Sequence, residues 1–403
     1  MTNSKHVPKR RFSGFEEAWY LIALEEIAKI TMGQSPNGET YSDTPNDYIL
    51  VQGNADLVEG WVKPRLWTTQ VTKRADKGDI IMSVRAPAGE VGRTNYDVVI
   101  GRGVAAIKGN DFIFQRLIKM NLDGYWKSLS AGSTFESLNS DDIKRAIFKI
   151  PSIHEQEYIG RFFETLDSFI SLHQHKLDKL KNLKKAYLSE MFPAEGERVP
   201  KRRFPGFEGE WEHKKLGQLM DVGSVKRVHQ SDWRDRGVRF LRARDIVSES
   251  KNKKPDDFLY IDEELYKKYS AISGMVEKGD LLVTGVGTIG VPMLVESSEP
   301  LYFKDGNIIW FKNKNLLDGH FFYYSFTARA IQKFIGDVAG VGTVGTYTID
   351  SGKNTLIILP VTKEEQVVIG NFFKKLDQSI TLQQQKLDKL NDLKKAYLNE
   401  LFV

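Results

Sequence analysis

Residues 156–192 read QEYIGRFFETLDSFISLHQHKLDKLKNLKKAYLSEMF, and residues 366–402 read QVVIGNFFKKLDQSITLQQQKLDKLNDLKKAYLNELF. At an offset of 210, roughly 23 of the 37 positions are identical. Apolar residues recur in each copy at alternating steps of four and three, with no proline inside, which is typical of a coiled-coil helix. At 1.5 Å per residue, each helix would be roughly 50 Å long. The predicted seam residues are Ile159, Phe163, Leu166, Ile170, His173, Leu177 and Leu180 in the first copy and Ile369, Phe373, Leu376, Ile380, Gln383, Leu387 and Leu390 in the second.

The two helices are most simply each other's partner. A duplicated chain is expected to fold with pseudo-two-fold symmetry, and a two-fold axis across the pair makes the helices antiparallel. His173 and Gln383, both near mid-helix, would then lie close together in an otherwise apolar seam. Such a polar layer lowers stability but fixes the register of the pair. The alternative is that each helix only caps the domain that precedes it.

The composition is that of an ordinary globular protein. Its 403 residues exceed one ordinary domain, and 41% are hydrophobic and 28% charged. No apolar run approaches 18 residues, so we expect no membrane span, and the basic residues 1–11 lack the apolar region of a signal peptide. The absence of cysteine excludes disulfides and cysteine-ligated zinc and fits a cytoplasmic protein. The net charge of +5 permits an anionic partner such as nucleic acid.

A shorter duplication precedes each half of the chain. Residues 8–16 and 200–208 both begin with Pro-Lys-Arg-Arg-Phe, and the segments end at Trp19 and Trp211. Proline, glycine and clustered charge indicate an extended, turn-rich strap. The blocks that follow the straps differ from one another, although a Lys-Gly-Asp turn leads into an apolar strand in both, at 77–84 and 278–283.

The predicted fold class is α+β, with two α/β domains of pseudo-two-fold symmetry separated by two long helices in an antiparallel coiled coil. In the first block we expect strands at 47–52, 79–84 and 97–100 and helices at 112–122 and 140–144. The predicted organisation is a strap at 1–19, a domain at 20–150, a helix at 151–193, a linker and second strap at 194–211, a second domain at 212–359 and a second helix at 360–403.

The motifs of common catalytic sites are missing. Two G-x-G-x-x-G strings occur, at 285–290 and 340–345, but the residues after each are typical of a strand or loop, whereas dinucleotide binding needs a helix there. There is no phosphate-binding P-loop, no H-E-x-x-H and no Asn/Asp-Pro-Pro-aromatic tetrapeptide. The segment 255–268, with Asp256, Asp257 and Glu264, only loosely resembles a metal nuclease. We therefore predict no catalytic residue, no metal and no cofactor on this chain.

Binding remains, and the charged and polar residues of the two blocks favour DNA. Arginine grips phosphate or guanine bidentately, and polar loop residues can read base edges. The candidate DNA-binding residues are Gln34, Ser35, Arg65, Lys73, Arg74, Arg85, Arg93, Arg102, Ser133 and Thr134 in the first block and Ser224, Lys226, Arg227, Arg242, Arg244, Thr343 and Thr346 in the second.

This arrangement resembles the specificity subunit of type I restriction–modification enzymes (HsdS). The matching features are the two straps ending in tryptophan, Gly33-Gln34-Ser35-Pro36 at the start of the first block, the Lys-Gly-Asp strands, the Glu-Gln pairs at 155–156 and 365–366, and the repeated Leu-Lys-Lys-Ala-Tyr-Leu ending. The resemblance covers nearly the whole chain, and the matching features occur in the same order in both halves. The second block departs from it at Gly223-Ser224-Val225, so equivalent contact positions in the two blocks stay open.

The resemblance implies two target recognition domains, each reading one half of a split double-stranded DNA sequence. It implies that the helices space these domains and dock two modification subunits, which bring S-adenosylmethionine and methylate adenine. Restriction subunits, which bring ATP- and Mg²⁺-dependent translocation and cleavage, would join that complex. The chain itself would be non-catalytic. The alternatives are a stand-alone DNA-binding regulator, a coiled-coil scaffold that binds no DNA, and an intrinsic nuclease or methyltransferase, which the missing motifs disfavour.

Overall fold

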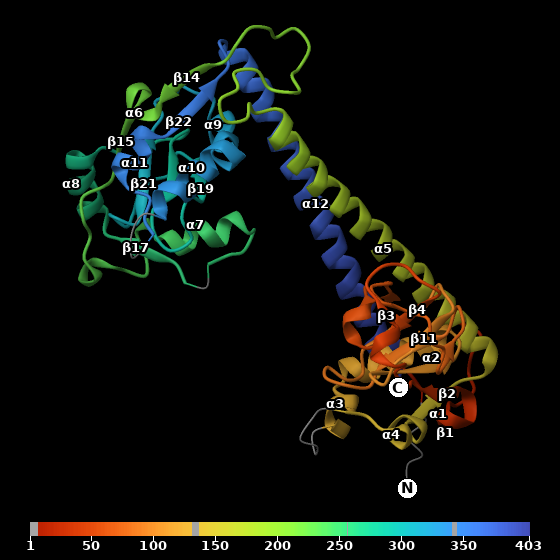
Figure 1. Ribbon diagram of the computed structural model, residues 1–403. Coiled ribbons are helices and arrows are strands. Elements are labelled where there is room, and N and C mark those ends of the chain that lie inside the picture. Colours follow the sequence, from red (N-terminus) through yellow and green to blue (C-terminus); the bar gives the residue numbers. More distant parts are fainter. Residues whose placement is uncertain (1–6, 131–136, 256, 341–344) are drawn as a thin grey trace. The chain divides into compact units, whose positions relative to one another are not determined.

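The chain forms two compact units, and each unit takes a part of both long helices (Figure 1). The computed structural model describes residues 7–130, 137–255, 257–340 and 345–403. Unit 1 comprises Met1–His175 and Gln384–Val403, and unit 2 comprises Lys176–Gln383. The long helices are α5 (Ile153–Glu190) and α12 (Lys363–Leu401), which contain the two repeated stretches.

Unit 1 is built on three sheets. Its six-stranded sheet has the order β2 (Lys29–Met32), β12 (Val104–Lys108), β9 (Ile80–Ser83), β10 (Val91–Arg93), β6 (Trp61–Val62) and β5 (Leu57–Val58). The five-stranded sheet has the order β3 (Tyr41–Ser42), β7 (Trp67–Thr68), β4 (Tyr48–Val51), β11 (Val98–Ile100) and β8 (Arg74–Ala75). A two-stranded sheet pairs β1 (Tyr20–Ala23) with β13 (Ile147–Ile150). The short helices are α1 (Leu24–Ile27), α2 (Asp111–Leu122), α3 (Tyr125–Ser130) and α4 (Ser140–Lys144).

Unit 2 repeats this plan with fewer strands. Its four-stranded sheet has the order β15 (Asp221–Gly223), β21 (Ile308–Lys312), β18 (Leu281–Thr284) and β19 (Pro292–Leu294). The other two sheets are β17 (Leu259–Ile261), β16 (Val238–Leu241) and β20 (Leu301–Phe303), and β14 (Glu212–Lys215) with β22 (Leu356–Leu359). The helices are α6 (Leu216–Leu219), α7 (Ala243–Ser250), α8 (Glu263–Ser273), α9 (Gly319–Thr327), α10 (Arg329–Ala339) and α11 (Ile349–Asn354).

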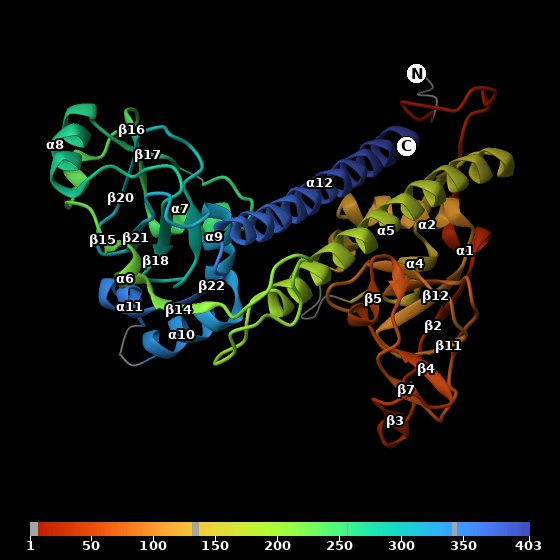
Figure 2. The same ribbon diagram turned by 90° about the horizontal axis from the view of Figure 1, so that it is seen from above.

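The two long helices pair antiparallel in each unit, as the repeat predicts (Figure 2). In unit 1 the Phe162 and Tyr397 rings lie 4.9 Å apart, and Lys394 pairs with Asp167 at 2.6 Å. In unit 2 the Tyr187 and Phe372 rings lie 5.1 Å apart, and Lys184 pairs with Asp377 at 2.6 Å. Residue numbers therefore rise along α5 while they fall along α12. The fold class is the expected α+β arrangement around an antiparallel helical pair.

The predicted seam residues are buried or half-buried. The buried ones are Ile159, Phe163, Leu166, Leu177, Ile369, Phe373, Leu376 and Leu387. The half-buried ones are Ile170, His173, Leu180, Ile380, Gln383 and Leu390. His173 belongs to unit 1 and Gln383 to unit 2. Their proximity stays a prediction.

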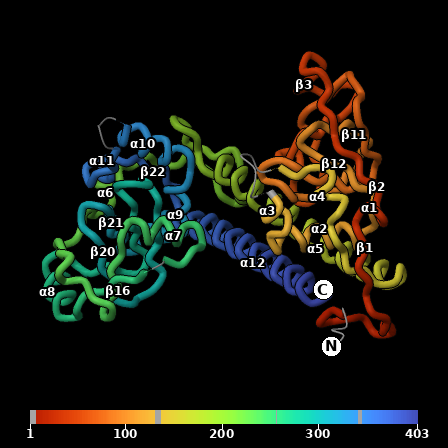
Figure 3. Tube along the Cα trace, turned by 90° about the horizontal axis from the view of Figure 1, so that it is seen from below, coloured from red at the N-terminus to blue at the C-terminus, as the bar shows by residue number. Residues whose placement is uncertain are grey.

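In each strap, two successive arginines contact the two long helices of the unit. Arg10 donates its backbone N–H to the Glu400 carbonyl near the end of α12 (2.9 Å), and Arg11 forms a bidentate pair with Glu155 in the first turn of α5. Figure 3 shows the strap of residues 7–19 passing beside the C-terminal end. In unit 2, Arg202 and Arg203 make the same contacts with Glu190 and Glu365.

The tryptophan that ends each strap closes an aromatic core around a helix end. In unit 1, Trp19 and Phe402 lie against Phe112 and Phe163. In unit 2, Trp211 and Phe192 lie against Phe321 and Phe373. All eight side chains are at most 7% exposed. Since full burial of a phenylalanine contributes roughly 1.5–3 kcal/mol, each cluster ties both long helices firmly to its unit.

The first glycine string is followed by a strand rather than a helix, as the sequence analysis predicts. Residues 285–290 form the turn from β18 into β19. The second string, 340–345, lies partly outside the described residues, and the loop after it runs to Thr348 before the short helix α11 begins. Among the described residues, no group of three histidine, aspartate or glutamate side chains is placed to hold a metal ion.

Candidate nucleic-acid interface

One pair of parallel strands in each unit ends at the same edge of its sheet. In unit 1, β4 and β11 run parallel with Val51 opposite Ile100, and in unit 2, β16 and β20 run parallel with Leu241 opposite Phe303. The chain leaves each pair in the same way, because Gly101 N–H donates to the Val51 carbonyl and Lys304 N–H donates to the Leu241 carbonyl, both at 2.8 Å. We call the loops after these strands the carboxyl edge of each unit. In open α/β sheets, ligands bind in this position.

The carboxyl edge of unit 1 gathers candidates from distant parts of the sequence. Gln34 N–H donates to the Ile100 carbonyl (2.9 Å), and Ser35 Oγ accepts from Arg102 N–H (3.1 Å). Ile100 N–H donates to the Lys73 carbonyl (2.9 Å), which brings the segment before β8 to the same place. Gln34, Lys73 and Arg102 are exposed. Four of the predicted residues therefore meet at one edge.

Two glycines allow the loops of this edge to interlock. A Cβ on Gly33 would lie 2.0 Å from the Gly101 carbonyl oxygen, and a Cβ on Gly103 would lie 1.9 Å from the Gln52 carbonyl oxygen. No other residue fits such an approach of backbone to backbone. The loops at 33–35, 52–53 and 101–103 therefore form one rigid platform for the side chains that they carry.

A buried carboxylate holds the loop after β4. Asp56, 3% exposed, accepts from Gln52 N–H (2.7 Å) and Gly53 N–H (3.2 Å), and it pairs with Arg65 at 2.9 Å. The Arg65 side chain is 56% exposed, so part of its guanidinium stays open to an anion. Arg65 thus combines a structural contact with an accessible charge at the carboxyl edge.

The remaining arginines of the first block have different surroundings. Arg85 is exposed and follows Val84, whose N–H donates to the Gly103 carbonyl (2.9 Å), so it lies beside the carboxyl edge. Arg74 is exposed and lies over the Tyr48 ring at 4.9 Å. Arg93 is 15% exposed, pairs with Asp111 at 2.6 Å and lies opposite Ile80 at the start of β9, away from this edge. Ser133 and Thr134 lie outside the described residues.

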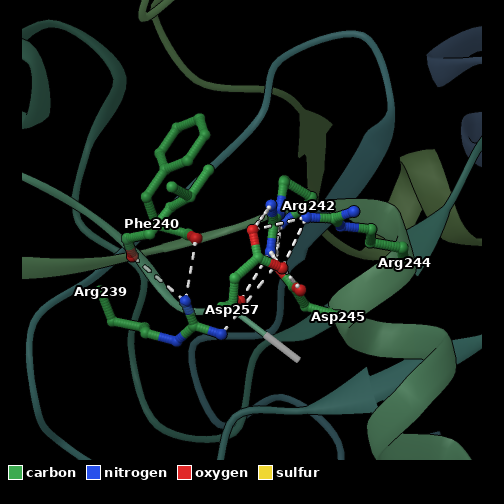
Figure 4. Close-up of polar contacts among 7 residues, drawn as sticks. Arg239, Phe240, Arg242, Arg244, Asp245 and Asp257 are labelled. Carbon is green, nitrogen blue, oxygen red and sulfur yellow. Dashed lines mark hydrogen bonds and ion pairs between the residues drawn. The ribbon is translucent and has the colours of Figure 1, made fainter. Parts of the chain in front are cut away.

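The carboxyl edge of unit 2 carries a dense arginine–aspartate network (Figure 4). Arg242 follows β16 directly and donates to Asp245 (3.0 Å) and to Asp257 (2.9 Å). Burial opposes the charge of Arg242, but the hydrogen bonds to Asp257 and Asp245 outweigh it, so the pKa of Arg242 is raised. Its side chain is only 11% exposed, and we assign it a positioning role. Among the described residues, Arg244 pairs with Asp257 alone, and its side chain is 63% exposed, which leaves it accessible.

Of the acidic residues considered for a nuclease site, Asp257 belongs to this network, whereas Glu264 is exposed on α8. The hydrogen bond from Arg242 lowers the pKa of Asp257, and Arg244 pairs with the same carboxylate at 2.7 Å. Asp256 lies outside the described residues. The Asp257 carboxylate thus pairs with two arginines, which is typical of a structural counter-ion.

The other unit 2 candidates lie on loops near the same edge. Arg227 is 68% exposed and pairs with Asp305 at 2.8 Å, directly beyond β20. Lys226 is exposed, and its backbone is fixed by Ser273 and Tyr302. Ser224 is half-buried, and its hydroxyl has no hydrogen-bond partner among the described residues.

Thr346 and Thr343 complete the candidates of the second block. Thr346 is half-buried and precedes Tyr347, whose N–H donates to the Gly285 carbonyl (2.9 Å) just beyond β18. Thr343 lies outside the described residues. Among the described residues of this edge, the exposed cations are therefore more accessible than Thr346.

Sequence reasoning missed two residues that the structure places at the carboxyl edges. Gln52 follows β4 and is half-buried. Lys304 follows β20, is half-buried and lies over the Trp233 ring at 5.8 Å. The available signal was their position directly after an apolar strand, but the sequence does not show that these strands run parallel to β11 and β16.

The chain matches one family over most of its length. Residues 16–182 and 208–392 match the description "Type I restriction modification DNA specificity domain". A sequence from Methanocaldococcus jannaschii, named as the MjaX type I restriction enzyme specificity subunit, is 29% identical over 195 residues, 46% of this chain and 45% of that one. One from Haemophilus influenzae, named as specificity subunit S.HindORF215P, is 31% identical over 176 residues, 42% of this chain and 43% of that one. The chain thus matches less than half the length of these two relatives.

A longer match and two solved structures extend this similarity. The MjaIX specificity subunit of M. jannaschii is 21% identical over 380 residues, 85% of this chain and 83% of that one. The type I S subunit from M. genitalium shares the fold with a TM-score of 0.66 at 15% identity, over 98% of this chain and 99% of that one. A chain from a study of assembly of the type I R-M system has a TM-score of 0.53 at 17% identity, over 96% of this chain and 98% of that one.

No helix in the described part of the chain has the length and apolar character that crossing a bilayer requires.

Proposed function

This chain belongs to the type I restriction modification DNA specificity family, and from that premise we propose that it is the DNA-reading subunit of a type I complex. The blocks at 20–150 and 212–359 are the two target recognition domains, and each reads one half of a split site in double-stranded DNA. The observation that carries the proposal is the carboxyl edge, which recurs in both units with the same backbone geometry and different side chains.

The chemistry of the two edges suits nucleic acid. Exposed arginine and lysine side chains neutralise phosphates and hold the protein in register, and polar side chains on a rigid platform read base edges. The exposed cations include Arg65, Lys73, Arg85 and Arg102 in unit 1 and Lys226, Arg227 and Arg244 in unit 2. Because the side chains of the two edges differ, the two half-sites differ as well, and the whole site is asymmetric.

The paired helices are the frame that separates the two readers and docks two modification subunits. Half-sites read from one face of B-DNA lie about 34 Å apart, which a helical pair of roughly 50 Å can span. Lys176, Lys179, Lys386 and Lys389 are exposed on these helices and are candidate contacts for the partners. Restriction subunits join through the modification subunits. Methylation and cleavage, with S-adenosylmethionine, ATP and Mg²⁺, take place on the partners, in the cytoplasm.

Co-expression with type I modification subunits tests this proposal. We expect no adenine methylation from the chain alone, and methylation of one split, asymmetric motif once the subunits are added. Binding to a duplex bearing that motif should weaken steeply with salt, because phosphate contacts release counterions. Sequence-specific binding by the isolated chain, with no methylation by the complex, would instead indicate a stand-alone regulator, and binding to proteins but to no duplex would indicate a scaffold.

A matched pair of variants separates contact residues from general charge. Lys226→Ala removes a cation at the carboxyl edge of unit 2 and should reduce the slope of log affinity against log salt by about one. Lys267→Ala removes another exposed lysine, from α8, and should leave the slope unchanged. This helix begins after Ile261, which pairs with Val238 at the start of β16, whereas the carboxyl edge lies at the end of that strand. Equal slopes for the two variants would count against the carboxyl edge as the DNA-binding face.

A further inference from the structure

The position directly after the first parallel strand differs between the units in a way that bears on specificity. In unit 1 it is Gln52, after β4, and in unit 2 it is Arg242, after β16. A buried aspartate holds the backbone N–H of both: Asp56 accepts from Gln52 (2.7 Å), and Asp245 accepts from Arg242 (2.8 Å). The two residues therefore occupy equivalent places on equivalent loops.

The cation that neutralises the buried aspartate has a different origin in each unit. In unit 2, Arg242 itself pairs with Asp245, so its side chain is turned into the protein. In unit 1, Arg65 from a later loop pairs with Asp56. Because Arg65 neutralises Asp56, the residue after β4 does not need to be a cation, and the neutral side chain of Gln52 stands there instead.

The released carboxamide lies at the centre of the platform. The position of a Cβ on Gly101 would be 2.9 Å from Gln52 Oε1 and 3.3 Å from Ser35 Oγ, so the two polar side chains converge over Gly101. The Gln52 side chain is half-buried, and its amide forms no hydrogen bond with any of the described residues. A carboxamide that is unpaired among the described residues, on a backbone that Asp56 holds, offers a donor and an acceptor to a ligand.

We infer that Gln52 is a specificity-determining residue of unit 1 that reads the edge of one base, an adenine, in the first half-site. A carboxamide donates to N7 and accepts from the N6 amino group of adenine in the major groove, and each such pair is the usual basis for choosing A·T over other pairs. The inference rests on the proposed function. It assigns Arg242, the counterpart in unit 2, to holding its loop rather than to reading a base.

Competition between duplexes tests the inference in the complex with modification subunits. Gln52→Ala should lower the preference for the cognate duplex over one with a substituted A·T pair on the order of tenfold to a hundredfold, at one position of one half-site only. Methylation mapping should show that position relaxed and the other half-site unchanged. The variant should keep the wild-type thermal stability, because the removed amide has no partner within the described part of the chain.

Asn95→Ala provides the matched control. Asn95 is an exposed amide in the turn before β11, at the opposite end of that strand. The Asn95→Ala variant should leave the methylated motif unchanged. A Gln52→Ala complex whose motif is unchanged at every A·T pair, or whose affinity falls equally for all duplexes, would overturn the inference while the proposed function stands. A wild-type complex that methylates no split motif would refute the proposed function itself.

Discussion

The buried ion pair between Arg11 and Glu155 gives a prediction about what attaches the strap to the frame. Glu155 is 1% exposed and Arg11 12% exposed, and the guanidinium meets both carboxylate oxygens at 2.7 Å. Arg11→Met would leave the carboxylate buried without a counter-charge, which typically costs about 3–5 kcal/mol. The double variant Arg11→Met with Glu155→Met removes both charges, and we expect it to be more stable than the single variant and within about 1 kcal/mol of wild type.

Each unit has its own core, so the two units can unfold separately. Hydrogen exchange of individual peptides, measured at increasing urea concentrations, gives the loss of stability in each unit. For a slope near 3 kcal/mol per molar urea, the midpoint of unit 1 should shift by about 1 M in Arg11→Met. Arg203→Met breaks the equivalent pair with Glu365, which is also 1% exposed, and should shift unit 2 instead. A loss below about 1 kcal/mol in Arg11→Met, or a double variant less stable than the single one, would refute the reasoning.

Three further changes are predicted. Gly33→Ala places a Cβ 2.0 Å from the Gly101 carbonyl oxygen and should cost unit 1 about 3 kcal/mol or more in thermal or urea unfolding, whereas Gly38→Ala, with nothing within 4 Å, should be near neutral. Tyr324→Phe removes the hydroxyl that donates to Asp377 at 2.7 Å, so unit 2 should lose about 1.5–3 kcal/mol, and an unchanged urea midpoint would contradict this. Burial and, next, Lys374 lower the pKa of His320 from 6.5, while Glu296 and Asp318 oppose them. The unfolded chain therefore binds the proton more tightly, and the stability of unit 2 should fall as the pH drops through 6.5 towards the lowered pKa. His320→Gln should remove that dependence in urea titrations at several pH values.

The helical frame follows from sequence alone because its signals are local and repeated. The a/d pattern predicts both helices, and the duplication predicts their antiparallel pairing, which Phe162–Tyr397 and Lys184–Asp377 show in each unit. Short strands such as β9 and the helix α4 also follow from turn residues and capping. Asn139, for example, caps α4 by accepting from the Asp141 and Asp142 N–H groups.

The binding edge is harder to predict because long-range pairing creates it. Arg93, Arg242 and Arg244 read as equivalent cations in the sequence, but the partners of Arg93 and Arg242 bury them, while Arg244 stays accessible. Gln52 acquires its role only because β4 pairs with β11 and because Arg65 meets the charge of Asp56. Charge and polarity are visible in one sequence, whereas the identity of each partner depends on strand order.

The proposal that the length of the paired helices sets the gap between the two half-sites can be tested directly. Inserting seven residues after His175 and seven after Gln383, at the junctions between the units, preserves the a/d pattern of both helices and adds about 10 Å to the pair. Mapped adenine methylation by the complex should then show both half-sites unchanged and the unread gap longer by roughly three base pairs. A gap of unchanged length, or altered half-sites, would contradict the claim that the paired helices hold two independent readers apart.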